Sequence, residues 1–152
     1  MEKFRYSMQN ILNVQEKIEA QEKLAFQIAS EAVREEENKL QALFVKKAEY
    51  EEILRDRVRA KLNVKEIKSY RDAITNTEDR IVIQRGNLRK AEQKLEVQRK
   101  RLEEAIKERK VHEVLKENAF EEYKREYERE EQKIVDELVS FQYAEKQANS
   151  GS

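Results

Sequence analysis

Few residue types in this chain could act on a substrate or bind a metal ion. His112 is the single histidine and cysteine is absent, so the chain cannot form a His-rich or thiolate metal site. The two glycines, Gly86 and Gly151, cannot build a phosphate-binding loop of the GxxxxGKS/T or GxGxxG type. We therefore expect no metal site and no cofactor.

Carboxylates are the remaining candidates, and they are abundant. Runs such as VREEENK and YEREEQK are typical of solvated helix faces, on which ion pairs four residues apart contribute about 0.2–0.5 kcal/mol each. General acid–base catalysis requires a pocket that shifts the pKa of a carboxyl group, and a pair of long helices offers none. The sequence therefore predicts a protein that is not an enzyme.

Composition indicates which elements carry these residues. Of the 152 residues, 42% are charged and 38% are hydrophobic, and there is no proline. A compact globule needs turns, which are built largely from residue types that are scarce here. Abundant Glu, Lys, Arg, Gln and Leu indicate long helices or a coiled coil. Disorder is the alternative for so charged a chain, and the regular apolar positions described below argue against it.

Charge and hydropathy bear on partners and compartment. Basic and acidic residues number 32 each, and this formal net charge of zero argues against a nucleic-acid-binding protein. The longest apolar runs, ALFV and IVI, are far shorter than the ~20 residues that span a bilayer, and MEKFRYSMQN has no secretory hydrophobic region. We expect a cytoplasmic protein without direct membrane insertion. Residues 149–152 resemble a cloning tail.

A seven-residue apolar repeat runs through the second half of the chain. The positions three residues after each repeat residue are mostly small or polar, which predicts a narrow coiled-coil seam. From Ile106 the apolar spacing shifts through Val111, Val114 and Leu115, which predicts a stutter. The predicted structural core is Ile67, Ile74, Ile81, Leu88, Leu95 and Leu102.

The first half is less regular. Gln15 and Glu22 occupy seam positions and should weaken the pairing there, whereas three alanines should allow close approach of the helices. The expected stripe is Phe4, Met8, Ile11, Ile18, Ala25, Ala29, Ala32 and Val33, followed by Leu40, Leu43, Phe44, Tyr50, Ile53, Leu54 and Val58.

A helix start signal separates the halves. Asn63 followed by Glu66 matches a helix N-cap with its capping-box partner, so we expect the turn at about Leu62–Val64. A second start signal, Thr75 with Glu78, leaves open a short separate helix at the tip.

Two long helices joined by a short turn must run antiparallel to bury their stripes against each other. The sequence thus predicts an all-α fold, a long two-helix antiparallel coiled-coil hairpin that is monomeric on its own. We expect a single domain of residues 1–148, with arms of about 3–61 and 65–146 and a turn at about 62–64.

Aromatic residues should gather where the two chain ends meet. On this register Phe4 and Tyr6 lie opposite Phe120 and Tyr123 and should form a packed lock. The second arm should extend beyond the first after about Arg125. An apolar stripe on this overhang would be exposed, as is typical of partner surfaces; it consists of Ile134, Leu138 and Phe141.

Three segments of the chain carry a family resemblance. They are the opening FRYSMQNILNVQEKIEAQEKLAF, the middle AEYEEIL followed by SYRDAI, and the closing EQKIVDELVSFQY. With them, nearly the whole chain resembles the bacterial flagellar export protein family FliJ. None of the three is a catalytic signature, so the resemblance rests on length, order and the closing segment together.

The resemblance implies a soluble component of the flagellar type III protein export apparatus, peripheral to the cytoplasmic face of the inner membrane at the flagellar base. Proteins of this family form an antiparallel coiled coil that is similar to the central stalk of rotary ATPases. They associate with the export ATPase ring, contact the export gate protein FlhA and bind export chaperones.

Carried over to this chain, the resemblance implies two sets of binding residues. The ATPase-binding candidates are Gln132, Lys133, Ile134, Asp136, Glu137, Leu138 and Phe141, and the gate-binding candidates are Leu43, Tyr50 and Tyr70. Lys46 and Thr77 stand where the family has apolar residues, which puts the gate contact in doubt. The alternative function is a generic cytosolic scaffold coiled coil acting by dimerisation, which would need one helix to run straight through Asn63. A nucleic-acid-binding hairpin is disfavoured by the charge balance.

Overall fold

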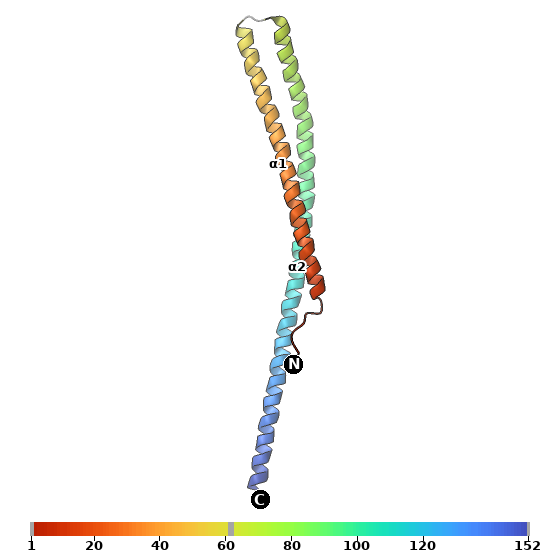
Figure 1. Cartoon of the computed structure of the whole chain (residues 1–152), viewed down its shortest axis with the longest axis vertical. Coiled ribbons are helices and arrows are strands. Elements are labelled where there is room, and N and C mark those ends of the chain that lie inside the picture. The colour runs from red at the N-terminus through yellow and green to blue at the C-terminus, as the bar shows by residue number, and fades with distance from the viewer. Residues whose placement is uncertain (1, 61–62, 152) are drawn as a thin grey trace. The chain divides into compact units, whose positions relative to one another are not determined.

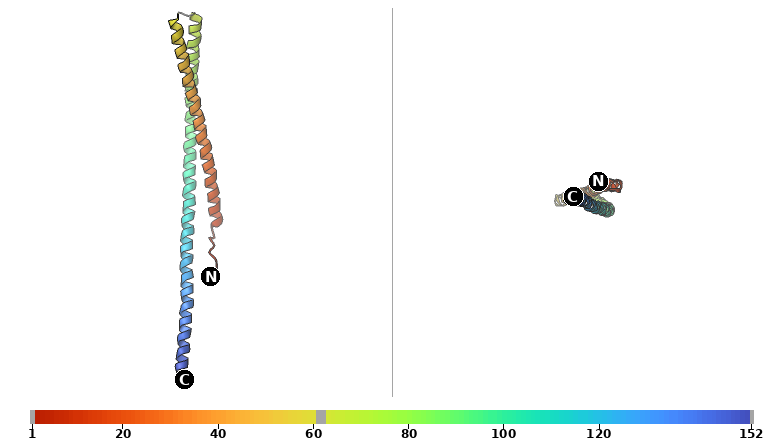
Figure 2. Two further views of the ribbon diagram at one scale, coloured as in Figure 1. Left: turned by 60° about the vertical axis from the view of Figure 1, so that its left-hand side comes forward. Right: turned by 90° about the horizontal axis from the view of Figure 1, so that it is seen from below.

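The described chain is built from two long helices. The computed structural model describes residues 2–60 and 63–151, which contain α1 (Gln9–Arg59, 51 residues) and α2 (Val64–Ser150, 87 residues) and no strand. The helices pack together as a hairpin (Figures 1 and 2), so the predicted all-α fold is confirmed. Contacts divide the chain into two units: unit one is Met1–Glu19 with Ala105–Ser152, and unit two is Ala20–Glu104.

Asn63 caps the N-terminus of α2. Its side-chain Oδ1 accepts a hydrogen bond from the Lys65 N–H at 3.1 Å, which satisfies one of the unpaired donors of the first turn. The Glu66 carboxylate lies 3.5 Å from Arg57 Nη1 of α1. Leu62, placed in the turn by the sequence, lies outside the described residues.

Helix α2 continues without a break through the second start signal at Thr75. Thr77 Oγ1 donates to the Ala73 carbonyl at 2.8 Å, a bond made within the helix rather than at a cap. Residues 64–74 therefore belong to α2 and do not form a separate helix. At the other ends, α1 begins at Gln9, later than the expected start near residue 3, and α2 reaches Ser150.

Both helices present a seam with strictly alternating steps of three and four residues. Every position of these two series is buried or half-buried. On α1 the series is Leu12, Gln15, Glu19, Glu22, Phe26, Ala29, Val33, Glu36, Leu40, Leu43, Lys47, Tyr50, Leu54 and Arg57. On α2 it is Ile67, Tyr70, Ile74, Thr77, Ile81, Gln84, Leu88, Ala91, Leu95, Gln98, Leu102, Ala105, Arg109, His112, Lys116, Ala119 and Tyr123.

The predicted stutter in the second arm is wrong. Val111, Val114 and Leu115, which suggested it, are exposed, and the seam continues in register through polar residues instead. One of these, Arg109, is stabilised across the helix pair, because its Nε donates to the Glu19 carboxylate and its Nη1 to Glu113 at 2.7 Å. The Glu113 hydrogen bond first, then that of Glu19, raises the pKa of Arg109.

The predicted stripe at the start of α1 is also displaced by one residue. Ile11 and Ile18 are exposed, whereas Leu12 is only 3% exposed and Glu19 is buried. Hydrophobicity alone predicts that the isoleucines are buried. Glu19 can be buried instead because its carboxylate accepts a hydrogen bond from Arg109. The seam therefore follows the position of Leu12.

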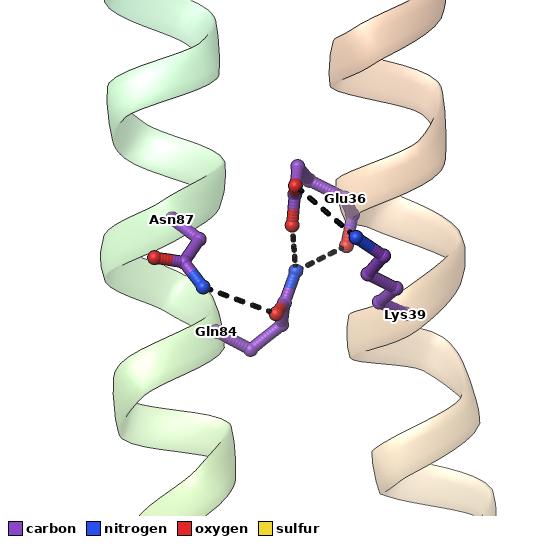
Figure 3. A network of polar contacts seen from close by, with 4 residues as sticks. All are labelled: Glu36, Lys39, Gln84 and Asn87. Atoms are coloured by element: carbon purple, nitrogen blue, oxygen red, sulfur yellow. Dashed lines mark hydrogen bonds and ion pairs between the residues drawn. The ribbon is translucent and has the colours of Figure 1, made fainter.

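Two glutamine side chains of α2 form hydrogen bonds across the seam of unit two. Gln84 Nε2 donates to the Glu36 carboxylate and to the Glu36 backbone carbonyl at 3.1 Å (Figure 3). Lys39 and Asn87 extend this network on their own helices. These bonds compensate the burial of polar groups among apolar neighbours.

The same arrangement recurs two heptads away. Gln98 Nε2 donates to the Glu22 carboxylate and, at 3.4 Å, to the Glu22 carbonyl. The pairs Glu36–Gln84 and Glu22–Gln98 differ by fourteen residues on each helix (36 − 22 and 98 − 84), in opposite directions. Unit two is therefore antiparallel and in one defined register.

Proline substitutions test the helix start. Ala91→Pro removes a hydrogen bond inside α2 and should cost about 3 kcal/mol. Val64→Pro replaces the first helical residue, whose N–H is not needed by the helix, and should cost far less. Thermal melts followed by circular dichroism compare the two, and equal losses would contradict a helix start at Val64.

We call the hydrogen-bonded pairs Glu36–Gln84 and Glu22–Gln98 the polar rungs, and a substitution pair tests the first of them. Gln84→Leu leaves the Glu36 carboxylate without its cross-helix donor and should cost about 1–3 kcal/mol of unfolding free energy. Glu36→Leu with Gln84→Leu should recover that loss, because an apolar pair needs no donor. Urea unfolding measures both, with Gln93→Leu on the exposed face as control. A double variant as unstable as the single one would contradict the pairing.

Candidate functional site: the terminal segment of α2

The non-helical residues at the start of the chain pack against α2 in unit one. The Phe4 ring lies 5.1 Å from the Phe120 ring, edge to face, and 5.4 Å from the Tyr123 ring. Tyr123 Oη donates to the Glu2 carbonyl at 2.7 Å, and the Tyr123 and Tyr127 rings lie 6.3 Å apart. These contacts confirm that Phe4 meets Phe120 and Tyr123, and we call the four rings the aromatic cluster.

Two buried polar atoms in unit one have no hydrogen-bond partner within the described part of the chain. They are the Tyr6 hydroxyl and His112 Nδ1. His112 occupies a seam position and is half-buried. The described residues also include no cluster of three or more His, Cys, Asp or Glu that could hold a metal ion.

Beyond the aromatic cluster the intramolecular seam ends. Every residue from Lys124 to Gly151 is exposed. From Tyr123 to Ser140, the positions that would continue the three–four alternation carry polar, mostly charged side chains: Glu126, Glu130, Lys133, Glu137 and Ser140. The side of α2 that carries the seam up to Tyr123 therefore has no apolar seam in this segment.

The apolar side chains of this segment occupy a different side of the helix. Ile134, Leu138 and Phe141 each follow a seam position by one residue, which rotates them by about 100° around the helix axis. They are 54%, 57% and 69% exposed, so the predicted exposed stripe is present. We define the terminal face as Ile134, Val135, Leu138, Val139 and Phe141.

The polar ATPase-binding candidates lie around this face. Gln132 Nε2 donates to Asp136 Oδ1 at 3.0 Å, one turn along the helix. Lys133 and Glu137 occupy the seam positions that adjoin Ile134 and Leu138. Val135 and Val139 were missed from the sequence, although they lie one position beyond Ile134 and Leu138 and are exposed by half or more.

The gate-binding candidates lie in the seam of unit two. Leu43, Tyr50 and Tyr70 are half-buried, and the two tyrosine rings pack 6.4 Å apart. Lys46 Nζ lies 5.9 Å from the centre of the Tyr50 ring. The structure thus joins the two tyrosines across the helices, and a partner could reach only their outer edges.

The predicted core residues lie in the same seam. Ile81 is buried, and the other five, Ile67, Ile74, Leu88, Leu95 and Leu102, are half-buried. Partial exposure is expected of a seam between only two helices, since no third layer covers its flanks.

Two exposed residues of α2 have shifted pKa values, and in each case the main cause is a hydrogen bond to a residue one turn away. Hydrogen bonding to Arg99 lowers the pKa of Glu96, and hydrogen bonding with Glu131 raises the pKa of Tyr127. Both pairs lie within α2, on exposed residues.

Comparison with protein families favours the export protein over the generic scaffold. The family model "Flagellar FliJ protein" matches residues 4–148. The chain belongs to the FliJ family. It is therefore a flagellar export-related protein, and the family is a non-enzymatic export component. No curated protein and no solved structure matches the chain.

The family match covers both the aromatic cluster and the terminal face, because it runs to residue 148. Neither α1 nor α2 contains a stretch long and apolar enough to cross a membrane.

The aromatic cluster can be tested by truncating the ring that the N-terminal segment contributes to it. Phe4→Ala should lower the unfolding free energy by about 1–2 kcal/mol, since ring pairs contribute beyond their buried area. Tyr143→Ala, on the exposed end of α2, is the control and should have little effect. Urea unfolding would argue against the cluster if both variants lost equal stability.

Proposed function

We propose that this FliJ-family protein acts as a stalk-like component of flagellar type III export. It associates with the export ATPase ring through the terminal face, contacts the gate protein FlhA near Tyr50 and Tyr70, and binds export chaperones. Its place of action is the cytoplasmic face of the inner membrane at the flagellar base. The family membership and the sequence resemblance described above support this proposal.

One observation carries the ATPase contact. The terminal face consists of large apolar side chains that are exposed, and it is rotated off the seam by one residue. Neighbouring exposed apolar side chains of this kind usually mark a protein–protein interface. Burying one of them fully in a partner contributes about 1.5–3 kcal/mol, so three would support a specific interaction.

The charge pattern suits a protein partner with mixed polarity. Lys133, Asp136 and Glu137 flank the apolar side chains and include both signs. A polar rim around an apolar centre is the usual anatomy of a specific interface. The rim would set orientation while the apolar side chains supply most of the binding free energy.

The alternative of a scaffold acting by dimerisation has less support. Each seam is already met by the other helix of the same chain, through the rungs Glu36–Gln84 and Glu22–Gln98. A parallel dimer would also require a helix through Asn63, which instead caps α2. We therefore expect a monomer in sedimentation equilibrium.

Replacing Ile134, Leu138 and Phe141 together by Ser tests the proposal. Helix content and melting temperature should change little, because these side chains make no intramolecular seam. Binding to the purified export ATPase, and any change the protein causes in its ATPase rate, should be lost.

Two controls frame this experiment. Val82, Ile83 and Val114 are also three exposed apolar residues of α2, and replacing them by Ser should leave ATPase binding intact. Leu88, Leu95 and Leu102 to Ser should unfold the hairpin. A large loss of melting temperature in the terminal variant, with ATPase binding following only the folded fraction, would refute the proposed role.

A further inference from the structure

A groove lies along α2 in unit two. Its volume is about 490 Å³, and its lining residues are Ala29, Lys90, Gln93, Lys94, Val97, Gln98 and Arg101. Ala29 occupies a seam position of α1, where a methyl group fills little space beside α2. Val97 is 52% exposed, so the groove has an apolar floor open to a partner.

All charged residues that line this groove are cations. Lys90, Lys94 and Arg101 line it, and no carboxylate does. Within the described residues, none of the three forms an ion pair, whereas Arg99 pairs with both Glu96 and Glu103. This local excess stands out in a chain whose basic and acidic residues balance.

The nearest seam carboxylate is already engaged. Glu22 accepts a hydrogen bond from the amide of Gln98, which itself lines the groove. That bond holds the Glu22 carboxylate at the seam. The positive charge of the groove therefore remains available to a ligand.

The spacing of the lining residues defines a straight strip. Lys90, Lys94, Val97 and Arg101 follow one another by four, three and four residues, so they lie on one side of α2. At 1.5 Å per residue the strip is roughly 16 Å long, about three turns of a second helix laid beside it.

We infer that this groove binds an acidic amphipathic helix of a partner protein. Apolar side chains of that helix would contact Ala29 and Val97, and its carboxylates would pair with the three cations. In helix-in-groove recognition the bound helix presents apolar anchors three and four residues apart, so that they lie along one of its sides. The site is distinct from the terminal face, so the inference does not rest on the proposed ATPase contact.

A nucleic acid fits the groove less well. Its lining contains no aromatic side chain on which a base could stack, and its floor is apolar. Proteins that bind phosphate backbones usually carry an overall basic excess, and this chain has a formal net charge of zero. Nucleic-acid binding is therefore the competing outcome of the test.

The probe is a fluorescein-labelled designed peptide of about three helical turns or more, with Leu on one face and Glu on both flanks. Fluorescence anisotropy on the full chain should show binding that weakens as salt is added. A peptide of the same composition with scrambled order should bind much less. A single-stranded oligonucleotide of equal charge is tested in parallel.

The decisive variant is Lys90→Glu with Lys94→Glu and Arg101→Glu. It should weaken peptide binding at least about tenfold, which three lost ion pairs readily supply. Lys68→Glu with Arg89→Glu and Lys100→Glu makes the same charge change at other exposed positions of α2 and should have less than about a twofold effect. Circular dichroism confirms that both variants remain helical.

Three results would overturn the inference. The first is equal weakening by the two triple variants, and the second is equal binding of the ordered and scrambled peptides. The third is oligonucleotide binding that is tighter than peptide binding and is lost in the groove variant. A Val97→Ser variant should weaken the ordered peptide several-fold, and no effect there would contradict the apolar contact.

Discussion

The register between α1 and α2 is the constraint on which the remaining features depend. Glu36 with Gln84 and Glu22 with Gln98 are hydrogen-bonded at one alignment of the helices in unit two. Sliding one helix by a heptad would leave these buried groups without partners, at about 1–3 kcal/mol each. Purely apolar seams lack this penalty, so the polar rungs trade some stability for a single alignment.

In unit one, α2 changes within a few residues from a helix that packs against the rest of the chain to a helix with an exposed apolar face. Up to Tyr123 the seam positions of α2 face α1 and the aromatic cluster. From Glu126 to Ser140 those positions are polar and mostly charged, and the large apolar side chains lie one residue further along the helix. A one-residue offset is enough to turn an internal seam into an exposed face, because successive side chains differ by about 100°. The positions of the apolar residues along α2 are thus enough to form the terminal face, without a loop or a pocket.

The apolar pattern was sufficient to predict the hairpin and the exposed stripe at Ile134, Leu138 and Phe141, and the helix start signal predicted the Asn63 cap. The apolar pattern alone was less reliable. It failed where polar residues occupy the seam. Ile11 and Ile18 look like core residues in isolation, and the hydrogen bond from Arg109 across the helices accounts for the burial of Glu19 in their place. The same cause produced the false stutter near Val111.

Other features could not be predicted from the sequence because they depend on how the two helices are aligned. The groove at Lys90, Lys94 and Arg101 depends on Ala29, a residue some sixty positions earlier in the chain. The ring contact of Tyr50 with Tyr70 follows from register, whereas the family resemblance implied only that both are gate-binding candidates. The gate contact and the ATPase contact remain predictions that the family membership supports.

Hydrogen exchange on the isolated protein tests the central claim most directly. If register leaves the end of α2 without an intramolecular partner, amides of residues 127–148 should exchange far faster than those of residues 80–104, because an unpaired helix opens locally at little cost. Mass spectrometry of peptic peptides resolves the two regions. Equal protection of both would contradict the account, since it would mean that the terminal segment is held by contacts within the chain or between copies.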